Sequence, residues 1–417
     1  MAAIFPFRAW RYAARAGEPA NLLTQPYDKI TPEMQDRYHS LSPYNLARII
    51  LGRREPDTAA DNVYSRAAAL WQDWTAAGIL TREAAPALFA YFQKFRLPEE
   101  PSGPAYVRKG LVALGPVADY SERIVYRHEL THSGPKRDRL ELLRRTRVHF
   151  EQLFLLYDDP QLAVDACLDR AAAAAEPLVC LSDEYGAEHR LWRIGEPSEI
   201  AAIQRLLAPH KLLIADGHHR YETALAFRDE NPGLSGARRV MMTLVNMSSP
   251  GLAILPTHRV VSGLDGFDPA RLFREAAGDF RIEEAPSLDA LRERVESAPA
   301  DRIAIGAMLR GDRRFLAFET PADGRLDVSV LHQALLARRL GLTPEAVREQ
   351  KSIGYVRGFQ AAAGAVADPA VQAVFFLRPV PARQVADVAF SGGVMPQKST
   401  DFYPKLLSGL TIYRIED

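Results

Sequence analysis

Apolar positions follow a helical spacing in some stretches of the chain and form continuous runs in others. Residues 61–80 carry apolar side chains on a single helical face: Val63, Ala67, Leu70, Trp71 and Trp74. Gly78 then supplies a left-handed stop, so a helix is expected to end there. The apolar stretches 87–97 and 107–117 flank the turn-rich segment EEPSGP, which predicts a hairpin with a long loop.

Further stretches predict another helix and two more hairpins. Residues 136–154 are expected to form one helix with an apolar face. Residues 239–247 and 252–261 predict a hairpin joined by the turn SSPG, and residues 302–319 predict a hairpin of their own.

The elements mix helix and strand without a regular strand–helix–strand rhythm. This mixture favours the α+β class, with mixed sheets, over a doubly wound fold. Three segments are predicted: an N-terminal α+β segment over 1–118, a central core over 119–262 and a C-terminal α+β domain over 263–417.

The densest group of polar side chains follows an apolar strand in the segment KLLIADGHHRYETALAF. The strand ends in this run of residues: Asp216, Gly217, His218, His219 and Arg220. Glycine at a strand–helix turn permits a close backbone approach, and the helix N-terminus offers N–H groups to phosphate or carboxylate. The sequence therefore predicts a phosphate-binding turn. A solvated turn is one alternative, and a metal site built on Asp216, His218 and His219 is another.

Two other groups of polar residues are candidates for chemistry. Glu129 follows His128 at the end of a predicted strand, and Lys136 and Arg139 lie just beyond. A carboxylate beside a histidine and a basic helix start is a candidate general base, with a solvated strand end as the alternative. The C-terminal loop MPQKSTDFYPK contributes ammonium groups and hydroxyls that bind anions or close over a site, unless it is an ordinary surface turn.

Charge and hydropathy exclude several classes of protein. Lys and Arg together number 52, as do Asp and Glu, so the formal net charge is +0. This balance counts against a dedicated nucleic-acid binder, which usually carries a basic excess. No apolar run approaches the length of a membrane span, and arginines interrupt the N-terminus where a secretory signal needs an apolar core. A soluble, cytoplasmic protein is expected.

The motifs together resemble a known family. The chain is identified as a full-length member of the family called domain of unknown function 1015, on QPYDKI, SPYNLARI, the block from Glu129 to Leu140, IADGHHRYETAL, MTLVNM with SPGLAILPTHR, and MPQKSTDFYPKL. Lys29 and Asp401 depart from the pattern, because an apolar and an aromatic residue are expected there. The departures put fine substrate contacts in doubt.

A more distant resemblance suggests an activity. The strand–DGHHR–helix unit, preceded by a His–Glu pair, is similar to the nucleotide-handling core of partition protein B, sulfiredoxin and the archaeal ADP-dependent free serine kinase. The resemblance implies that residues 217–220 cradle phosphates and that Asp216 orients a histidine or a metal-bound water. It also implies that Glu129 takes the proton of a substrate hydroxyl.

These observations lead to the hypothesis of a kinase that transfers a phosphoryl group from ATP or ADP, with Mg²⁺, to a small hydroxyl metabolite such as free serine. Catalytic roles are expected for Glu129, His128, Asp216 and His218. Phosphate contacts are expected from Gly217, His219, Arg220, Lys136, Arg139, Lys398, Ser399 and Thr400. A substrate pocket is expected from Tyr27, Asp28, His258, Arg259, Tyr403 and Lys405. A phosphoserine-type phosphomonoester hydrolase and a nucleotide-gated binding protein are the alternatives.

Overall fold

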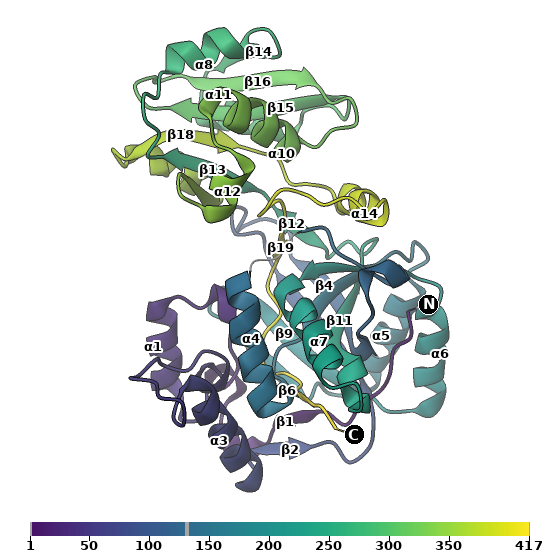
Figure 1. Ribbon diagram of the computed structural model, residues 1–417. Coiled ribbons are helices and arrows are strands. Elements are labelled where there is room, and N and C mark those ends of the chain that lie inside the picture. The colour runs from purple at the N-terminus through teal and green to yellow at the C-terminus, as the bar shows by residue number, and fades with distance from the viewer. Residues whose placement is uncertain (1, 130–132, 417) are drawn as a thin grey trace. The chain divides into compact units, whose positions relative to one another are not determined.

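The computed structural model describes residues 2–129 and 133–416, which form two compact units (Figure 1). Unit 1 comprises Met1–Leu97, Ser102–Leu252 and Pro404–Asp417, and unit 2 comprises Pro98–Pro101 and Ala253–Tyr403. Residues on both sides of the expected 118/119 boundary share unit 1, and the chain enters unit 2 ten residues before the expected 262/263 boundary. The C-terminal segment returns to unit 1.

Unit 1 contains an N-terminal group of helices and a large sheet with helices packed on it. Its strands are β1 (Trp10–Tyr12), β2 (Leu80–Arg82), β3 (Leu88–Phe95), β4 (Tyr106–Pro116), β5 (Val125–Tyr126), β6 (Val148–His149), β7 (Leu153–Tyr157), β8 (Val179–Ser182), β9 (Glu188–Ile194), β10 (Leu212–Asp216), β11 (Arg239–Asn246) and β20 (Tyr413–Arg414). Its helices are α1 (Pro32–Leu41), α2 (Ala47–Ile50), α3 (Val63–Ala76), α4 (Ser133–Thr146), α5 (Ala163–Ala174), α6 (Pro197–Leu207) and α7 (His218–Glu230).

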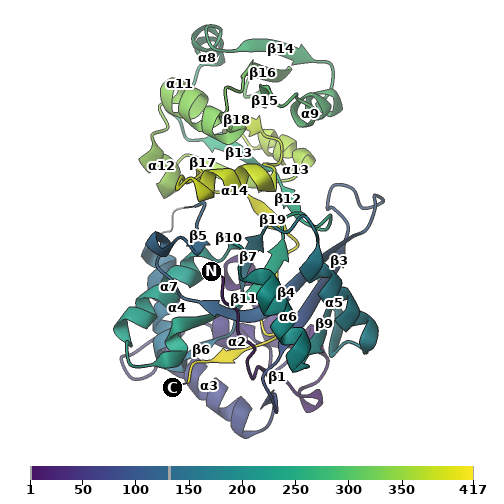
Figure 2. The ribbon, with the colours of Figure 1, turned by 90° about the vertical axis from the view of Figure 1, so that its right-hand side faces the viewer.

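The large sheet of unit 1 has the order β5-β10-β7-β11-β4-β3-β9-β8. The pairs β5–β10 and β7–β11 are parallel, and the other neighbours are antiparallel. The central strands are apolar on both faces, as strands covered on both sides require. Helices α4 and α7 lie side by side (Figure 1), and α5 packs against β4 and β9 with α6 beside it (Figure 2). This mixed sheet confirms the α+β class.

Unit 2 is built on an antiparallel sheet with the order β14-β16-β15-β18-β13-β17. Its strands are β12 (Ala253–Leu255), β13 (Thr257–Ser262), β14 (Arg281–Ala285), β15 (Arg302–Leu309), β16 (Phe315–Pro321), β17 (Ile353–Arg357), β18 (Val371–Phe376) and β19 (Asp401–Tyr403). Its helices are α8 (Pro269–Ala276), α9 (Leu288–Glu296), α10 (Asp327–Val330), α11 (Arg338–Leu340), α12 (Pro344–Glu349), α13 (Phe359–Gly364) and α14 (Ala382–Phe390).

Several predicted elements are confirmed. The helix expected within residues 61–80 is α3, and its two tryptophans Trp71 and Trp74 lie in a core with α2 and the C-terminal segment. Asn62 caps this helix through a reciprocal capping box with Ser65. The hairpins expected at 87–117 and at 302–319 are β3–β4 and β15–β16.

Two predictions of secondary structure are wrong. The helix expected over 136–154 ends at Thr146, because Arg147 adopts the left-handed conformation (φ 54°). The apolar run that follows contains β7. This strand lies between β10 and β11 in the sheet, and all of its side chains are buried. The hairpin expected over 239–261 does not form: β11 pairs with β4 and β7 in unit 1, whereas β13 pairs with β17 and β18 in unit 2.

Candidate functional site

The predicted strand–turn–helix unit is present and depends on a glycine. Strand β10 ends at Asp216, Gly217 has φ 96°, and α7 begins at His218. A Cβ at position 217 would lie 3.0 Å from Cδ2 of Leu153, so both the conformation and the space favour glycine. Within the described part of the chain, no side chain caps the N-terminus of α7. The first amide groups of this helix are therefore available to an anion.

Asp216 is held between two cations that lie far apart in the sequence. Its Oδ2 accepts a hydrogen bond from the Arg220 guanidinium at 2.9 Å, and its Oδ1 accepts one from Nζ of Lys405 at 3.2 Å. Burial raises the pKa of the Asp216 carboxyl, but Lys405, Arg220 and Lys29 lower it more, so the net pKa lies well below the ordinary value. The carboxylate is therefore ionised. We call Asp216, Arg220 and Lys405 the Asp216 cluster.

The backbone around Lys405 is fixed by two buried strand residues. Nε2 of Gln93 on β3 donates to the carbonyl oxygen of Lys405 at 2.8 Å. The Arg108 guanidinium on β4 donates to the carbonyl oxygen of Pro404 and to Oε1 of Gln93, and it lies 4.6 Å above the ring of Phe154. Burial lowers the pKa of Arg108 to about 10, which still leaves the guanidinium charged at neutral pH. The C-terminal segment is thus docked in an orientation that directs Lys405 to the turn.

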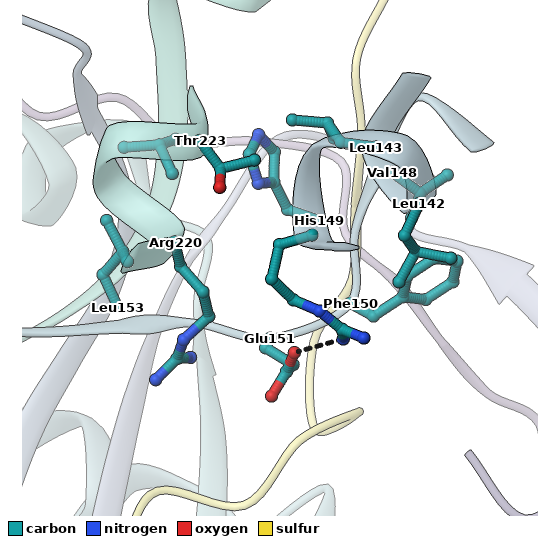
Figure 3. A pocket seen from close by; sticks show the side chains of 11 residues that line it. Leu142, Leu143, Val148, His149, Phe150, Glu151, Leu153, Arg220 and Thr223 are labelled. Carbon is teal, nitrogen blue, oxygen red and sulfur yellow. Dashed lines mark ion pairs between the residues drawn. The ribbon is translucent and has the colours of Figure 1, made fainter. Parts of the chain in front are cut away.

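A second group of residues contacts Arg220, and Figure 3 shows Arg220 and Glu151 among the side chains that line one pocket. NH1 of Arg220 donates to the carbonyl oxygen of Gln152 at 2.6 Å, and Glu151 lies close enough to help raise the pKa of Arg220. Oε1 of Glu151 accepts the backbone N–H of Tyr27 at 3.1 Å, and its Oε2 lies 3.7 Å from NH1 of Arg139. These side chains border a cavity of about 40 Å³, which suits water but is too small for a nucleotide.

Several predicted residues contact this group. Arg139 lies 4.0 Å above the ring of Tyr27 and donates to the carbonyl oxygen of Ile50 at 2.7 Å. Asp28 lies in the same short 3₁₀ helix as Tyr27 and contributes to the raised pKa of Arg220. Lys29, at the end of that helix, contributes to the lowered pKa of Asp216. The departure at position 29 therefore adds positive charge to the site.

Two buried histidines lie at the base of the turn. Nδ1–H of His128 donates to the carbonyl oxygen of Ile214 at 2.8 Å, and its ring lies edge-on to that of His218, with centroids 4.7 Å apart. Burial lowers the pKa of both histidines, so both are neutral at pH 7. His218 is 7% exposed, and its Nε2 has no hydrogen-bond partner among residues 2–129 and 133–416. A buried polar atom without a partner points to a missing ligand or water.

Glu129 lies at the same sheet edge as Asp216. Because β5 runs parallel to β10, with Tyr126 opposite Leu213, Glu129 and Asp216 each follow a paired residue by three positions. The next residues, 130–132, lie outside the described part of the chain. Lys136 donates from Nζ to Oε2 of Glu222 at 2.8 Å, so this lysine is ion-paired with α7.

His219 lies beside His218 on α7, and the remaining predicted residues belong to unit 2. His258 is buried against the rings of Phe359 and Phe376, which stack on each other, and burial lowers its pKa to about 3. The Arg259 guanidinium donates to the carbonyl oxygens of Gln397 and Lys398. These bonds anchor the loop that carries Ser399 and Thr400, and Tyr403 pairs with β12 through strand β19. His258 and Arg259 are thus both buried in unit 2, and their place in a substrate pocket stays a prediction.

Sequence reasoning missed the residues that position the cluster. Glu151, Arg108 and Gln93 each lie within apolar stretches, and each is almost fully buried. A polar residue inside an apolar strand was the available signal, because a buried charge needs a partner. Besides bonding to each other, Gln93 and Arg108 bond to Lys405 and Pro404, which lie 312 and 296 residues away in the sequence, so no local pattern identifies these partners.

The described residues do not form a group of metal-ligating side chains. In the part of the chain that the structure describes, no three His, Cys, Asp or Glu side chains converge in a way that could hold a metal ion. No helix of the described residues is long and apolar enough to cross a bilayer.

The fold and the site define an α+β protein with a cationic strand–turn–helix site in its larger unit. The chain belongs to the family described as "Protein of unknown function (DUF1015)", whose model matches residues 4–335. A search of curated proteins found no match.

Solved structures similar to the chain have 12% sequence identity to it. A free serine kinase in complex with AMP has a TM-score of 0.37 and covers 70% of this chain and 88% of its own. A conserved hypothetical protein from Pyrococcus furiosus has a TM-score of 0.35, with 70% and 92% covered. SbnI with a C-terminal truncation, from Staphylococcus aureus, has a TM-score of 0.35, with 72% and 87% covered.

Proposed function

We propose that the protein binds a nucleotide at the β10–α7 turn and transfers a phosphoryl group from ATP or ADP to the hydroxyl of a small metabolite such as free serine. The observation that carries the proposal is the buried Nε2 of His218, which has no partner among the described residues and lies in the first turn of an uncapped helix. A helix N-terminus with such a donor or acceptor suits an anionic ligand.

The charges around the turn support a phosphate rather than a neutral ligand. Lys405, Arg220 and Lys29 lie near Asp216, and Arg108 lies close enough to interact with it. Glu151 and Asp28 lie near Arg220, so these four cations face three carboxylates. Phosphoryl transfer depends mainly on positioning and on neutralising charge, which this set of cations can supply. Gly217 permits the backbone to approach the phosphates closely.

Glu129 is the candidate base of this reaction. Its carboxylate would take the proton of the substrate hydroxyl as the hydroxyl oxygen bonds to the terminal phosphorus. The bond from that phosphorus to its bridging oxygen breaks, and the shortened nucleotide leaves. The parallel pairing of β5 and β10 supports this assignment, because it brings Glu129 to the edge where Asp216 lies.

Mg²⁺ would enter with the nucleotide. Asp216 already accepts hydrogen bonds from Lys405 and Arg220, and the described residues offer no cage of carboxylates. Mg²⁺ commonly binds through substrate phosphates and one or two carboxylates, which fits such a site. When bound, the ion neutralises negative charge on the phosphates.

The test compares Glu129→Gln with Glu176→Gln, an exposed glutamate on unit 1. Phosphorus-labelled ATP and ADP are offered with serine and Mg²⁺, and nucleotide affinity is measured separately by calorimetry. We expect Glu129→Gln to lower turnover at least about a hundredfold while nucleotide affinity stays within about twofold. Glu176→Gln should behave as the wild type.

Three other results would contradict parts of the proposed function. Equal loss of turnover and of nucleotide binding in Glu129→Gln would contradict its role as a base. Release of inorganic phosphate from phosphoserine without any nucleotide would replace the kinase with the hydrolase. Absence of nucleotide binding by the wild type would overturn the proposal.

A further inference from the structure

A second group of arginines lines a groove on unit 1 that the proposed function does not use. The groove has a volume of about 370 Å³ and lies between α3, the end of α4 and the C-terminal strand. Arg145, Arg147 and Arg414 line it, and all three are exposed. We call this the arginine groove.

The charge in the arginine groove is unbalanced. Within residues 2–129 and 133–416, none of the three arginines forms an ion pair or a side-chain hydrogen bond. The carboxylate in the lining, Glu416, accepts a hydrogen bond from NH2 of Arg82 at 2.5 Å and is thereby neutralised. Three exposed arginines consequently line one groove, and Glu416 is the single carboxylate among the described residues that line it.

The backbone holds these arginines in fixed positions. Arg414 lies opposite Val148 in the β6–β20 pair, and the N–H of Ile415 donates to the carbonyl oxygen of Arg147 at 2.8 Å. Two apolar residues of the lining, Trp71 and Ile415, are buried in the core of unit 1. The groove is therefore preformed and does not depend on a flexible loop.

Arg147 occupies a position where glycine would be less strained. It directly follows the last residue of α4 and has φ 54°, a conformation that side chains with a Cβ rarely adopt. The same conformation occurs at Arg123 (φ 55°), outside the groove, so the lining of the groove and not the backbone conformation singles out Arg147.

We propose that the arginine groove binds a small polyanion of the oligophosphate class, at a site separate from the β10–α7 turn. Guanidinium groups bind phosphate oxygens through paired N–H donors, and three of them match a ligand with more than one phosphate. The groove volume lies in the range of small-molecule sites. This inference does not depend on the proposed catalytic function.

Arg147→Gly provides the decisive variant, and Arg123→Gly is its matched control. Both arginines are exposed and left-handed, with φ 54° and 55°, but Arg123 does not line the groove. Glycine adopts this conformation without strain, so both variants should fold, with melting temperatures unchanged or raised. A loss of binding in Arg147→Gly can then be attributed to its guanidinium.

The full-length protein is titrated with tripolyphosphate by calorimetry, alongside Arg220→Gln. We expect Arg147→Gly to weaken binding at the groove at least about tenfold, since a charge-assisted hydrogen bond contributes that much. Arg123→Gly should match the wild type, and Arg220→Gln should leave the groove site intact.

The titrations test the arginine groove and the proposed phosphate site at the turn separately. Identical titrations of Arg147→Gly and Arg123→Gly, or no tripolyphosphate binding by the wild type, would overturn the groove. Loss of groove binding in Arg147→Gly together with an unaltered Arg220→Gln titration would support the groove and count against phosphate at the turn.

Discussion

Asp216 shows how opposing electrostatic effects decide the state of one carboxyl. Burial alone would favour the protonated form, but cations from Lys405, Arg220 and Lys29 favour the charged form and prevail. The proposed phosphate would interact with the same cations, which the Asp216 carboxylate otherwise neutralises in part. The pair of histidines below it stays neutral for the opposite reason, since burial outweighs the nearby carboxylates.

Replacing Asp216 by Asn should make stability less dependent on pH. The folded pKa of Asp216 lies below the unfolded value of about 3.9, so its stabilisation is complete above that pH and is lost as the pH falls toward the folded pKa. Asp216→Asn should cost about 2 to 3 kcal/mol at pH 7, because Lys405 and Arg220 lose their partner. The deficit should shrink below about pH 4.

Urea denaturation at pH 7, 5 and 3 measures this effect. Asp229→Asn serves as the control, because Asp229 lies on the same helix in an exposed ion pair worth at most about 1 kcal/mol. A deficit of equal size at all three pH values would show that the carboxylate charge is not responsible.

The β10–α7 turn has the structure that local chemistry predicts, whereas the end of α4 does not. Gly217 permits the turn, and a Cβ at this position would lie 3.0 Å from Cδ2 of Leu153, so that Leu153 would have to shift. No glycine marks the end of α4 in the sequence, because the residue that adopts the left-handed conformation there is Arg147. The apolar segment that follows forms β7, because pairing with β10 and β11 buries all of its side chains.

Alanine at position 217 should destabilise the turn more than it would a similar turn elsewhere. Gly186 also has positive φ (77°), but no atom would lie within 4 Å of a Cβ added there, so Gly186→Ala measures conformational strain alone. That strain is about 1 kcal/mol. Gly217→Ala adds the contact with Leu153, and we expect a total of about 2 to 3 kcal/mol in urea denaturation.

Equal losses in the two alanine variants would show that Leu153 moves aside without cost. Nucleotide or phosphate binding by Gly217→Ala should also weaken, since the added methyl group lies at the first turn of α7.

At the scale of the whole molecule, the C-terminal segment completes unit 1 after the chain has formed unit 2. Thr24 and Ser408 pair through their backbones, Ile412 pairs with Trp10, and β20 pairs with β6. Lys405 reaches the turn because this segment is docked. The site therefore requires contacts between residues 189 positions apart.

Shortening a buried side chain of the C-terminal segment should destabilise unit 1 and leave unit 2 unchanged. Ile412 is fully buried in the core of α2 and α3, and Ile305 is equally buried in β15 of unit 2. Each change to alanine should cost about 2 to 5 kcal/mol. In hydrogen exchange, Ile412→Ala should lower protection of α3 and spare β15, and Ile305→Ala should do the reverse. Parallel loss of protection in both units by either variant would mean that the units do not open independently.

The amino-acid sequence determined the local elements and the chemistry available at the turn. The apolar spacing predicted α3, β3–β4 and β15–β16, and the DGHHR run predicted the strand, glycine turn and helix, because these features depend on neighbouring residues. The sheet order and the splitting of 239–261 between two units depend on distant partners and were not predictable. The partners of Asp216 divide in the same way. Arg220 lies one helical turn along α7 and follows from the sequence, whereas Lys405 is brought there only by tertiary packing of a buried segment.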